Sequence, residues 1–174
     1  MTQTDVFLAQ LEAEAKRTRG ALERVPEGKG EWTPHPKSMP FGRLAMLVAR
    51  MPSWIAMVIE RDELDLNPPG GSNIDQRPLR TAADLVEAMD AGVAQSRQAL
   101  RSLTDERLMK PWRLLVSGRV VSEEPRHVVL RDTFMHLAHH RGQLTVYLRL
   151  NGAPVPAIYG PSADAQPKTM AIGG

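Results

Sequence analysis

The stretch from Leu130 to Leu148 constrains the fold of this chain more than any other segment. Its apolar residues recur at spacings of three, four and seven positions: Leu130, Phe134, Leu137, Leu144 and Leu148. This periodicity predicts an amphipathic helix. A second, polar stripe runs beside the apolar one and consists of His136, His140, Gln143 and Tyr147. A helix with a polar stripe next to its core stripe is suited to line a pocket between helices.

The polar stripe contains two histidines, His136 and His140, which lie four residues apart. On a helix this spacing places them on one face, one turn above the other. Paired imidazoles in this arrangement bind a cation in the zinc-binding His-x-x-x-His helices, although most pairs with this spacing are accidental or structural. His139 points about 100° away from His140, which favours a surface or supporting role. A catalytic zinc usually takes three protein ligands, so a third ligand must come from elsewhere.

Composition narrows the class of protein. The chain has 174 residues, of which 42% are hydrophobic and 24% charged, as expected for one globular domain spanning residues 1–174. The formal net charge is only +2 and no dense basic run occurs, so we expect no nucleic-acid partner. The absence of cysteine excludes disulfides, thiolate metal sites and a cysteine nucleophile. No long apolar run or signal peptide is recognisable, so we expect a cytoplasmic protein with no membrane partner.

Four amphipathic segments predict four helices. They cover about residues 5–24, residues 41–60, a segment that opens at Thr81, and a segment that opens at residues 123–125 and ends at Asn151–Gly152. Thr2 with Asp5, and Thr81 with Asp84, have the spacing of capping boxes. Pro52 predicts a kink in the second helix.

The connecting segments contain few signs of regular structure. Residues 31–40 are an extended, proline-rich connector, residues 62–78 form a long loop, and residues 155–174 follow the surface as a tail. Residues 104–121 are irregular, with a weak alternative of a hairpin that pairs Trp112–Val116 with Val120–Val121. Without a convincing sheet, the pattern predicts an all-α fold, a four-helix bundle with two long connecting loops.

Three parts of the sequence resemble the DinB/YfiT-like superfamily. They are residues 32–39, residues 42–45 followed by 51–54, and residues 136–144 continued by 147–152, 154–156 and 159–164. The third contains the continuous run His136–Leu144, followed by Tyr147–Gly152. The resemblance implies a four-helix bundle, homodimers, and metal-dependent hydrolases or thiol-dependent transferases. It also implies a divalent metal, commonly zinc or nickel, held by three histidines.

The metal-ligand pattern of that superfamily is incomplete in this chain. His136 and His140 match two of its ligands. The third belongs to a Gly-x-Leu-Ala-x-His pattern, but the matching segment runs from Gly42 to Leu47 and ends in leucine. Leucine has no lone pair for a cation, so we expect a degenerate site that binds metal weakly or not at all. His35, His127 and Asp164 do not occupy the family's ligand position and are not expected to replace it.

Three functional interpretations therefore stay open. In the first, a metal-dependent hydrolase or thiol transferase uses Gln143 and Tyr147 to orient a substrate and Arg141 to meet an acidic group. Each of these three side chains has an equally good packing or ion-pairing alternative, and no catalytic residue is assigned. In the second, a non-catalytic bundle binds an unknown small molecule. In the third, a stress-associated homodimer uses apolar residues of the second helix, among them Leu47, Trp54 and Met57.

Overall fold

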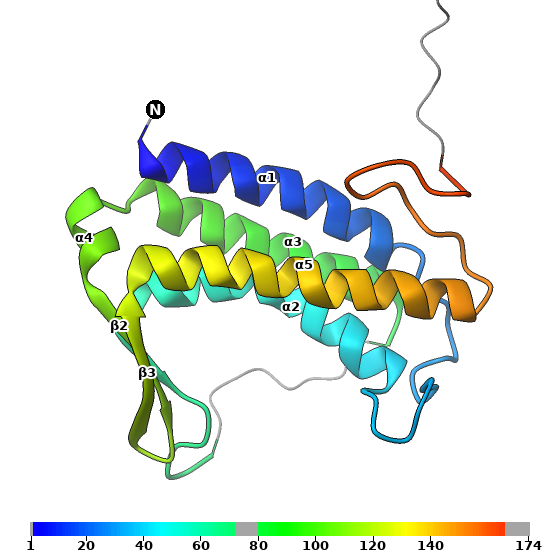
Figure 1. Cartoon of the computed structure of the whole chain (residues 1–174), viewed down its shortest axis with the longest axis horizontal. Coiled ribbons are helices and arrows are strands. Elements are labelled where there is room, and N and C mark those ends of the chain that lie inside the picture. The colour runs from blue at the N-terminus through cyan, green and yellow to red at the C-terminus, as the bar shows by residue number, and fades with distance from the viewer. Residues whose placement is uncertain (1, 72–79, 166–174) are drawn as a thin grey trace, which may run out of the picture.

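The computed structural model describes residues 2–71 and 80–165. Four long helices lie side by side (Figure 1): α1 (Gln3–Leu22), α2 (Phe41–Glu60), α3 (Ala82–Arg101) and α5 (Arg126–Leu150). α2 packs against both α3 and α5, and α1 packs mainly against α3. The short helix α4 (Asp105–Met109) and the strands β1 (Glu63–Asp65), β2 (Pro111–Val116) and β3 (Arg119–Pro125) gather at one end of the bundle.

The helices begin where local chemistry satisfies their first N–H groups. The Thr2 hydroxyl accepts from the Asp5 N–H, the Asp5 carboxylate accepts from the Thr2 N–H, and Thr81 and Asp84 do the same for α3. Both predicted capping boxes are confirmed. The last helix begins at Arg126 rather than at residues 123–125, because these residues continue a strand.

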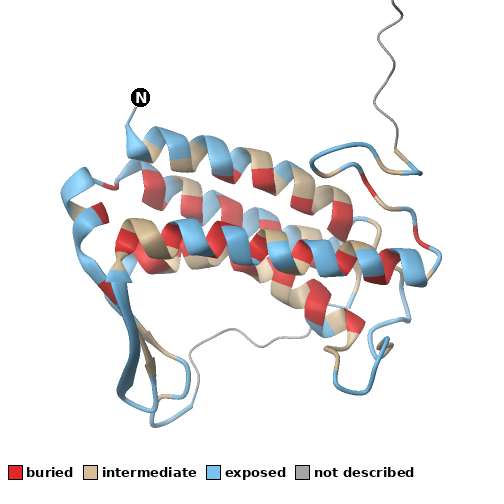
Figure 2. Cartoon of the chain, in the orientation of Figure 1, coloured by how far each residue is buried: buried red, intermediate tan, exposed pale blue. Residues whose placement is uncertain are grey.

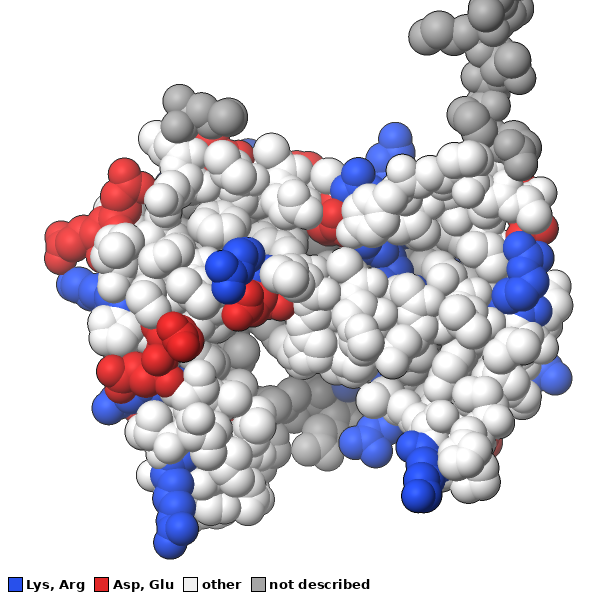
Figure 3. All heavy atoms as spheres, in the orientation of Figure 1, with Lys and Arg blue, Asp and Glu red and all other residues white. Residues whose placement is uncertain are grey.

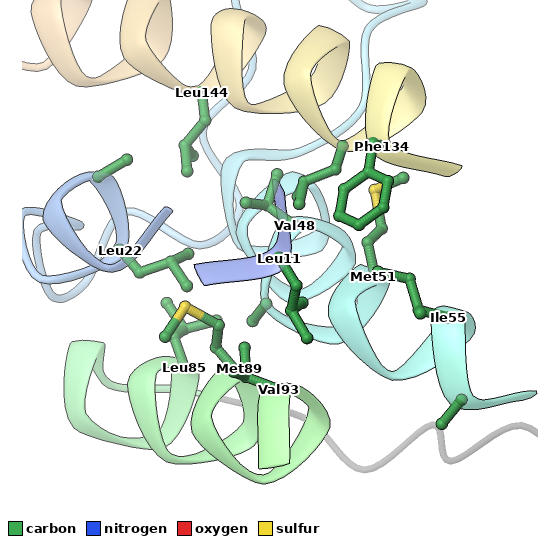
Figure 4. Packing of buried hydrophobic residues seen from close by; sticks show 14 of the residues in the cluster. Leu11, Leu22, Val48, Met51, Ile55, Leu85, Met89, Val93, Phe134 and Leu144 are labelled. Carbon is green, nitrogen blue, oxygen red and sulfur yellow. The ribbon is translucent and has the colours of Figure 1, made fainter. Parts of the chain in front are cut away.

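The core lies between the four long helices, with α2 at its centre. Eleven of the twenty residues of α2 are buried, and Figure 2 shows that the buried residues line the inward faces of the bundle. Figure 4 shows side chains from all four long helices pointing toward one another, including Leu11, Val48, Met89 and Phe134. Among the described residues, α2 is the one helix long and apolar enough to cross a membrane, a property that the central helix of a bundle shares.

The prediction of an all-α fold is wrong, because the chain also forms a small mixed sheet. Its strand order is β1-β2-β3, with β1 parallel to β2 and β2 antiparallel to β3. The hairpin, predicted only as a weak alternative, is present and longer than expected. Its turn is set by Ser117 and Gly118, which both adopt positive φ (51° and 77°), as two-residue hairpin turns require.

The strand β1 lies within the stretch that the sequence predicts as a loop. Asp65 anchors this strand to the hairpin, because its carboxylate accepts hydrogen bonds from the backbone N–H groups of Ser117 (2.9 Å) and Gly118 (2.7 Å). Residues 72–78 of that predicted loop lie outside the described residues, as do residues 166–174 of the predicted tail. The sheet thus forms a wall at one end of α2 and α5.

Arg126 fixes the junction between the sheet and the helices. Its buried guanidinium donates to the carbonyl oxygens of Val58 (2.7 Å) and Arg61 (2.8 Å) and to the carboxylate of Asp62 (2.6 Å). These bonds satisfy carbonyl groups at the end of α2, where a helix has no N–H partners of its own. The first turn of α5 is therefore held against the last turn of α2.

Candidate functional site

The two histidines of α5 converge on one point. The Nε2 atoms of His136 and His140 lie 2.8 Å apart, and their ring centroids are separated by 4.6 Å. His140 is half-buried, whereas His136 is more exposed. The pair therefore lies at the rim of the bundle, with both Nε2 atoms directed toward the same position.

Gln143 orients this pair. The Nδ1 atom of His140 lies 2.7 Å from the side-chain oxygen of Gln143. A carbonyl oxygen only accepts hydrogen bonds, so this contact favours the neutral tautomer of His140 that carries its proton on Nδ1 and has a free lone pair on Nε2. In the contact between the imidazoles, His136 is consequently the donor. The sequence analysis left open a substrate-binding or a packing role for Gln143, and in the structure its side chain contacts His140 and favours one tautomer of that ring.

Helix α2 forms an apolar wall beside the pair. The ring of Trp54 lies 5.8 Å from that of His136, and the ring of Phe41 lies 5.7 Å from that of Tyr147. These two contacts show that α2 and α5 are antiparallel. Leu47 lies two turns before Trp54 on α2, between the two contacts, and is half-buried against the core. The position at which the superfamily pattern has a third histidine therefore carries an apolar side chain level with the middle of the polar stripe.

The residues at this site do not fit a three-histidine metal centre. Within residues 2–71 and 80–165, no group of three or more His, Cys, Asp or Glu side chains lies close enough together to hold a metal ion. The three alternative ligands have other partners. His35 accepts a hydrogen bond from the backbone of Lys37, Nδ1 of His127 contacts the carbonyl of Leu108, and Asp164 pairs with Arg149. The donor set is thus two imidazoles.

The surroundings of His136 favour its neutral form. Partial burial is the main cause that lowers the pKa of His136 below its usual value, and the nearby imidazoles of His140 and His139 lower it further. His139 contacts His140 edge-on, with 5.0 Å between the ring centroids, and remains exposed. It belongs to the surface next to the pair.

Arg141 and Tyr147 have structural partners. Arg141 is 1% exposed and pairs at 2.5 Å with Glu14 of α1, which is equally buried. The same guanidinium donates to the hydroxyls of Thr18 and Tyr159. The ring of Tyr147 packs edge-on against Trp32 and Phe41, and its hydroxyl donates to the carbonyl of Met39 at 3.1 Å. Of the four predicted pocket residues, Gln143 contacts the histidine pair directly, and Leu47 lies on α2, the helix that packs against α5.

A pocket that sequence reasoning missed opens next to His136. Its volume is about 230 Å³, and it lies between α2, α5 and the sheet. Asp132, Thr133 and His136 of α5 contribute polar groups to its lining. The other lining residues are apolar: Trp54, Met57, Val58, Leu64, Leu66, Trp112, Leu114 and Val129. The alternation of the apolar residues Trp112 and Leu114 was the one sequence signal for this pocket. No sequence pattern indicated that β1 would also line it.

The comparisons with known proteins agree with this architecture. The profile of the DinB family matches residues 1–169. The uncharacterized protein YrdA of Bacillus subtilis (strain 168) is 29% identical over 171 residues, which cover 94% of this chain and 93% of that protein.

Two solved structures share the fold. A DinB-like protein from Bacillus cereus ATCC 10987 superposes with a TM-score of 0.67 at 21% identity, over 88% of this chain and 95% of that one. The DinB-like protein YjoA from Bacillus subtilis gives a TM-score of 0.62 at 19% identity, over 84% and 92% of the two chains. A family profile that spans nearly the whole sequence, together with this shared fold, shows that the chain belongs to the DinB family.

Proposed function

We propose that this DinB-family protein is a non-catalytic small-molecule-binding protein whose histidine pair is a remnant of a metal site. The observation that carries the proposal is the donor set. His136 and His140 converge at 2.8 Å, but the helix that faces them presents Leu47 and Trp54. Next to this pair, the bundle contains an apolar pocket of about 230 Å³. A small pocket of apolar walls with a few polar groups is the usual form of a ligand site.

The competing proposal is a metal-dependent hydrolase or thiol transferase. Such an enzyme needs an ion held firmly enough to polarise a substrate or to lower the pKa of a bound water or thiol. Loss of a supporting residue around a metal site already weakens binding by roughly 10–100-fold, and loss of a direct ligand weakens it more. With leucine at position 47, we expect zinc or nickel to bind weakly and reversibly.

Metal content separates the two proposals. The protein is purified without a histidine tag, dialysed against a chelator and then against metal-free buffer, and analysed for zinc, nickel, copper and iron. We expect a metal content far below one ion per chain. A stoichiometric ion that resists the chelator would overturn the proposal and favour the enzyme.

A second proposal concerns the exposed face of α5, which we infer is the surface that forms a homodimer. Three large apolar side chains on it are more than half exposed: Met135 (63%), Val146 (55%) and Leu150 (58%). Between Asp132 and Arg149 the one charged residue of the helix is Arg141, which is buried. Figure 3 shows a correspondingly broad face with few Lys, Arg, Asp or Glu side chains. A contiguous uncharged patch of this kind favours a protein partner.

The pattern of this face is suited to a second copy of the chain. Gly142 lies near the middle of the stripe, and a Cβ atom added to it would meet nothing within 4 Å. An antiparallel pairing of two α5 helices centred on Gly142 places Met135 of one copy opposite Arg149–Leu150 of the other. It also brings Asp132, at one end of the stripe, within a turn of Arg149, at the other. This self-complementarity is what a two-fold interface requires.

Sedimentation tests the dimer. Val146→Asp introduces a charge in the middle of the stripe, and Val6→Asp makes the same change on the exposed surface of α1. We expect a dimeric wild type, a monomeric Val146→Asp variant and a dimeric Val6→Asp variant. A wild type that sediments as a monomer at high concentration would overturn this proposal.

A further inference from the structure

The pocket beside His136 has a size that restricts its ligand. An engineered cavity of about 150 Å³ in another protein binds benzene, so a volume of about 230 Å³ accommodates roughly nine non-hydrogen atoms. Pockets for drug-sized molecules are usually larger, about 300–1,000 Å³. A nucleotide would leave most of its atoms in solvent, whereas the nine or ten ring atoms of a molecule with two fused rings match the volume of the pocket.

The residues that line the pocket disfavour a charged ligand. No lysine or arginine lines it, so an anionic ligand has no counter-ion there. Its one acidic lining residue, Asp132, is exposed and already pairs with Arg131 at 2.8 Å. Trp54 from α2 and Trp112 from β2 add aromatic surface from two sides, and flat aromatic ligands pack well against such rings.

Trp112 adds an unused hydrogen-bond donor. Its side chain is 6% exposed and its Nε1 atom is buried, yet this atom has no hydrogen-bond partner among the described residues. A buried donor without a partner is less stable than a bonded one, because it has given up its hydrogen bond to water without replacement. A ligand that brings an acceptor to this N–H, after a small shift of the indole ring, would replace that hydrogen bond.

We infer that the pocket binds a small uncharged aromatic molecule of about two fused rings, with an oxygen or nitrogen acceptor that bonds to Nε1–H of Trp112. This inference rests on the proposed small-molecule-binding function and specifies the ligand. The rings lie between Trp54 and the apolar residues of the sheet. His136 and Thr133, at the polar end of the pocket, contact any second polar group.

The three tryptophans of the chain make the inference directly testable. Trp54 and Trp112 line the pocket, whereas Trp32 packs against Phe41 and Tyr147 elsewhere in the bundle. We suggest a titration of the full chain with 2-naphthol, a two-ring phenol, followed by the three indole N–H signals in ¹H–¹⁵N spectra. The signals are assigned with the single Trp→Phe variants. We expect the signals of Trp112 and Trp54 to shift, with Trp112 moving downfield as it gains an acceptor, and that of Trp32 to stay in place.

Two pairs of variants test the contacts. Trp112→Phe keeps a ring but removes the N–H, so it should weaken naphthol binding about tenfold, whereas Trp32→Phe should leave it unchanged. Val129→Phe fills the pocket and should abolish binding, whereas Val128→Phe, at the neighbouring position, should not.

Three results would overturn the inference. They are unchanged signals of Trp54 and Trp112 at millimolar naphthol, equal binding to the wild type and Val129→Phe, and shifts with tetramethylammonium or benzoate in place of naphthol. None of these results depends on metal. Failure of the proposed function, by contrast, appears as a tightly held ion in the elemental measurement.

Discussion

The hydroxyl of Ser96 in α3 donates a hydrogen bond to the carbonyl oxygen of Pro52 in α2, 2.6 Å away. The same hydroxyl accepts a hydrogen bond from the Ala56 N–H at 3.0 Å, so it bridges one turn of α2. Proline has no N–H and disturbs the helix around it, and Figure 1 shows that α2 bends along its length. Trp54, which contacts His136, lies within the bridged turn. The geometry of the candidate site thus depends on a contact between the two central helices.

Removal of this bridge should destabilise the protein. Ser96→Ala deletes the hydroxyl in a fully buried position and weakens the hydrogen bonding of the Pro52 carbonyl and the Ala56 N–H. We expect a loss of about 1–3 kcal/mol in the free energy of unfolding, measured in urea. Ser53→Ala is the matched control, because the Ser53 hydroxyl bonds within its own helix to the Arg50 carbonyl. It should change the stability by less than about 0.5 kcal/mol, and equal losses in the two variants would contradict the account.

The close approach of α2 and α3 also explains why position 92 is a glycine. A Cβ atom at this position would lie 2.9 Å from the backbone nitrogen of Ser53, so the helices would have to move apart. Gly92→Ala should therefore lower the free energy of unfolding by about 1–3 kcal/mol, despite the better helix propensity of alanine. At Gly20 the nearest atom, in Pro156, is at 3.6 Å, so Gly20→Ala should be neutral or stabilising. Thermal melting of both variants distinguishes steric from propensity effects.

The ion pair of Arg141 and Glu14 is predicted to stabilise the fold and to have no role in ligand binding. Arg141→Met leaves the buried carboxylate with Arg17 as its remaining charged partner and should cost about 3 kcal/mol or more. Arg97→Met breaks an exposed pair with Glu12 and should cost less than about 1 kcal/mol. If Arg141→Met keeps full stability but loses naphthol binding, Arg141 is a ligand contact and this account of it is wrong.

The lowered pKa of His136 predicts a pH dependence. Because the folded protein holds this imidazole neutral more strongly than the unfolded chain does, the unfolded chain takes up the proton first as the pH falls. The titration of His136 therefore leaves the free energy of unfolding unchanged above the unfolded pKa of 6.5 and lowers it as the pH falls below that value. We expect the melting temperature of the wild type to fall more between about pH 7.5 and about pH 5.5 than that of His136→Asn. A steeper fall in the variant would contradict the assignment.

The parts of the fold that follow from local periodicity could be predicted from the sequence. The four long helices and the capping boxes at Thr2 and Thr81 depend on residues within a few positions of one another. The strand β1 does not, because its three residues pair in parallel with β2, and Glu63 lies beside Arg113, fifty positions later. No periodicity is visible in three residues, which is why an all-α fold was expected.

In the candidate site, too, the features that depend on neighbouring residues could be predicted, and those that depend on tertiary packing could not. The spacing of His136, His140 and Gln143 on one helix was enough to predict that they lie together. An ion pair was one of the two alternatives predicted for Arg141, but its partner could not be named, because Glu14 lies on the first helix and meets Arg141 only through tertiary packing. The pocket required β1, β2, α2 and α5 at once, so its lining was visible only in three dimensions.

Zinc affinity of the wild type and of Leu47→His tests the central claim most directly. Each protein, without a tag, is titrated in competition with a chromogenic chelator, and Leu47→His with His136→Ala serves as the control. We predict weak binding by the wild type, binding more than about 100-fold tighter by Leu47→His, and loss of that gain in the control. Tight stoichiometric binding by the wild type, or no gain with Leu47→His, would contradict the claim that leucine at this position disables a metal site.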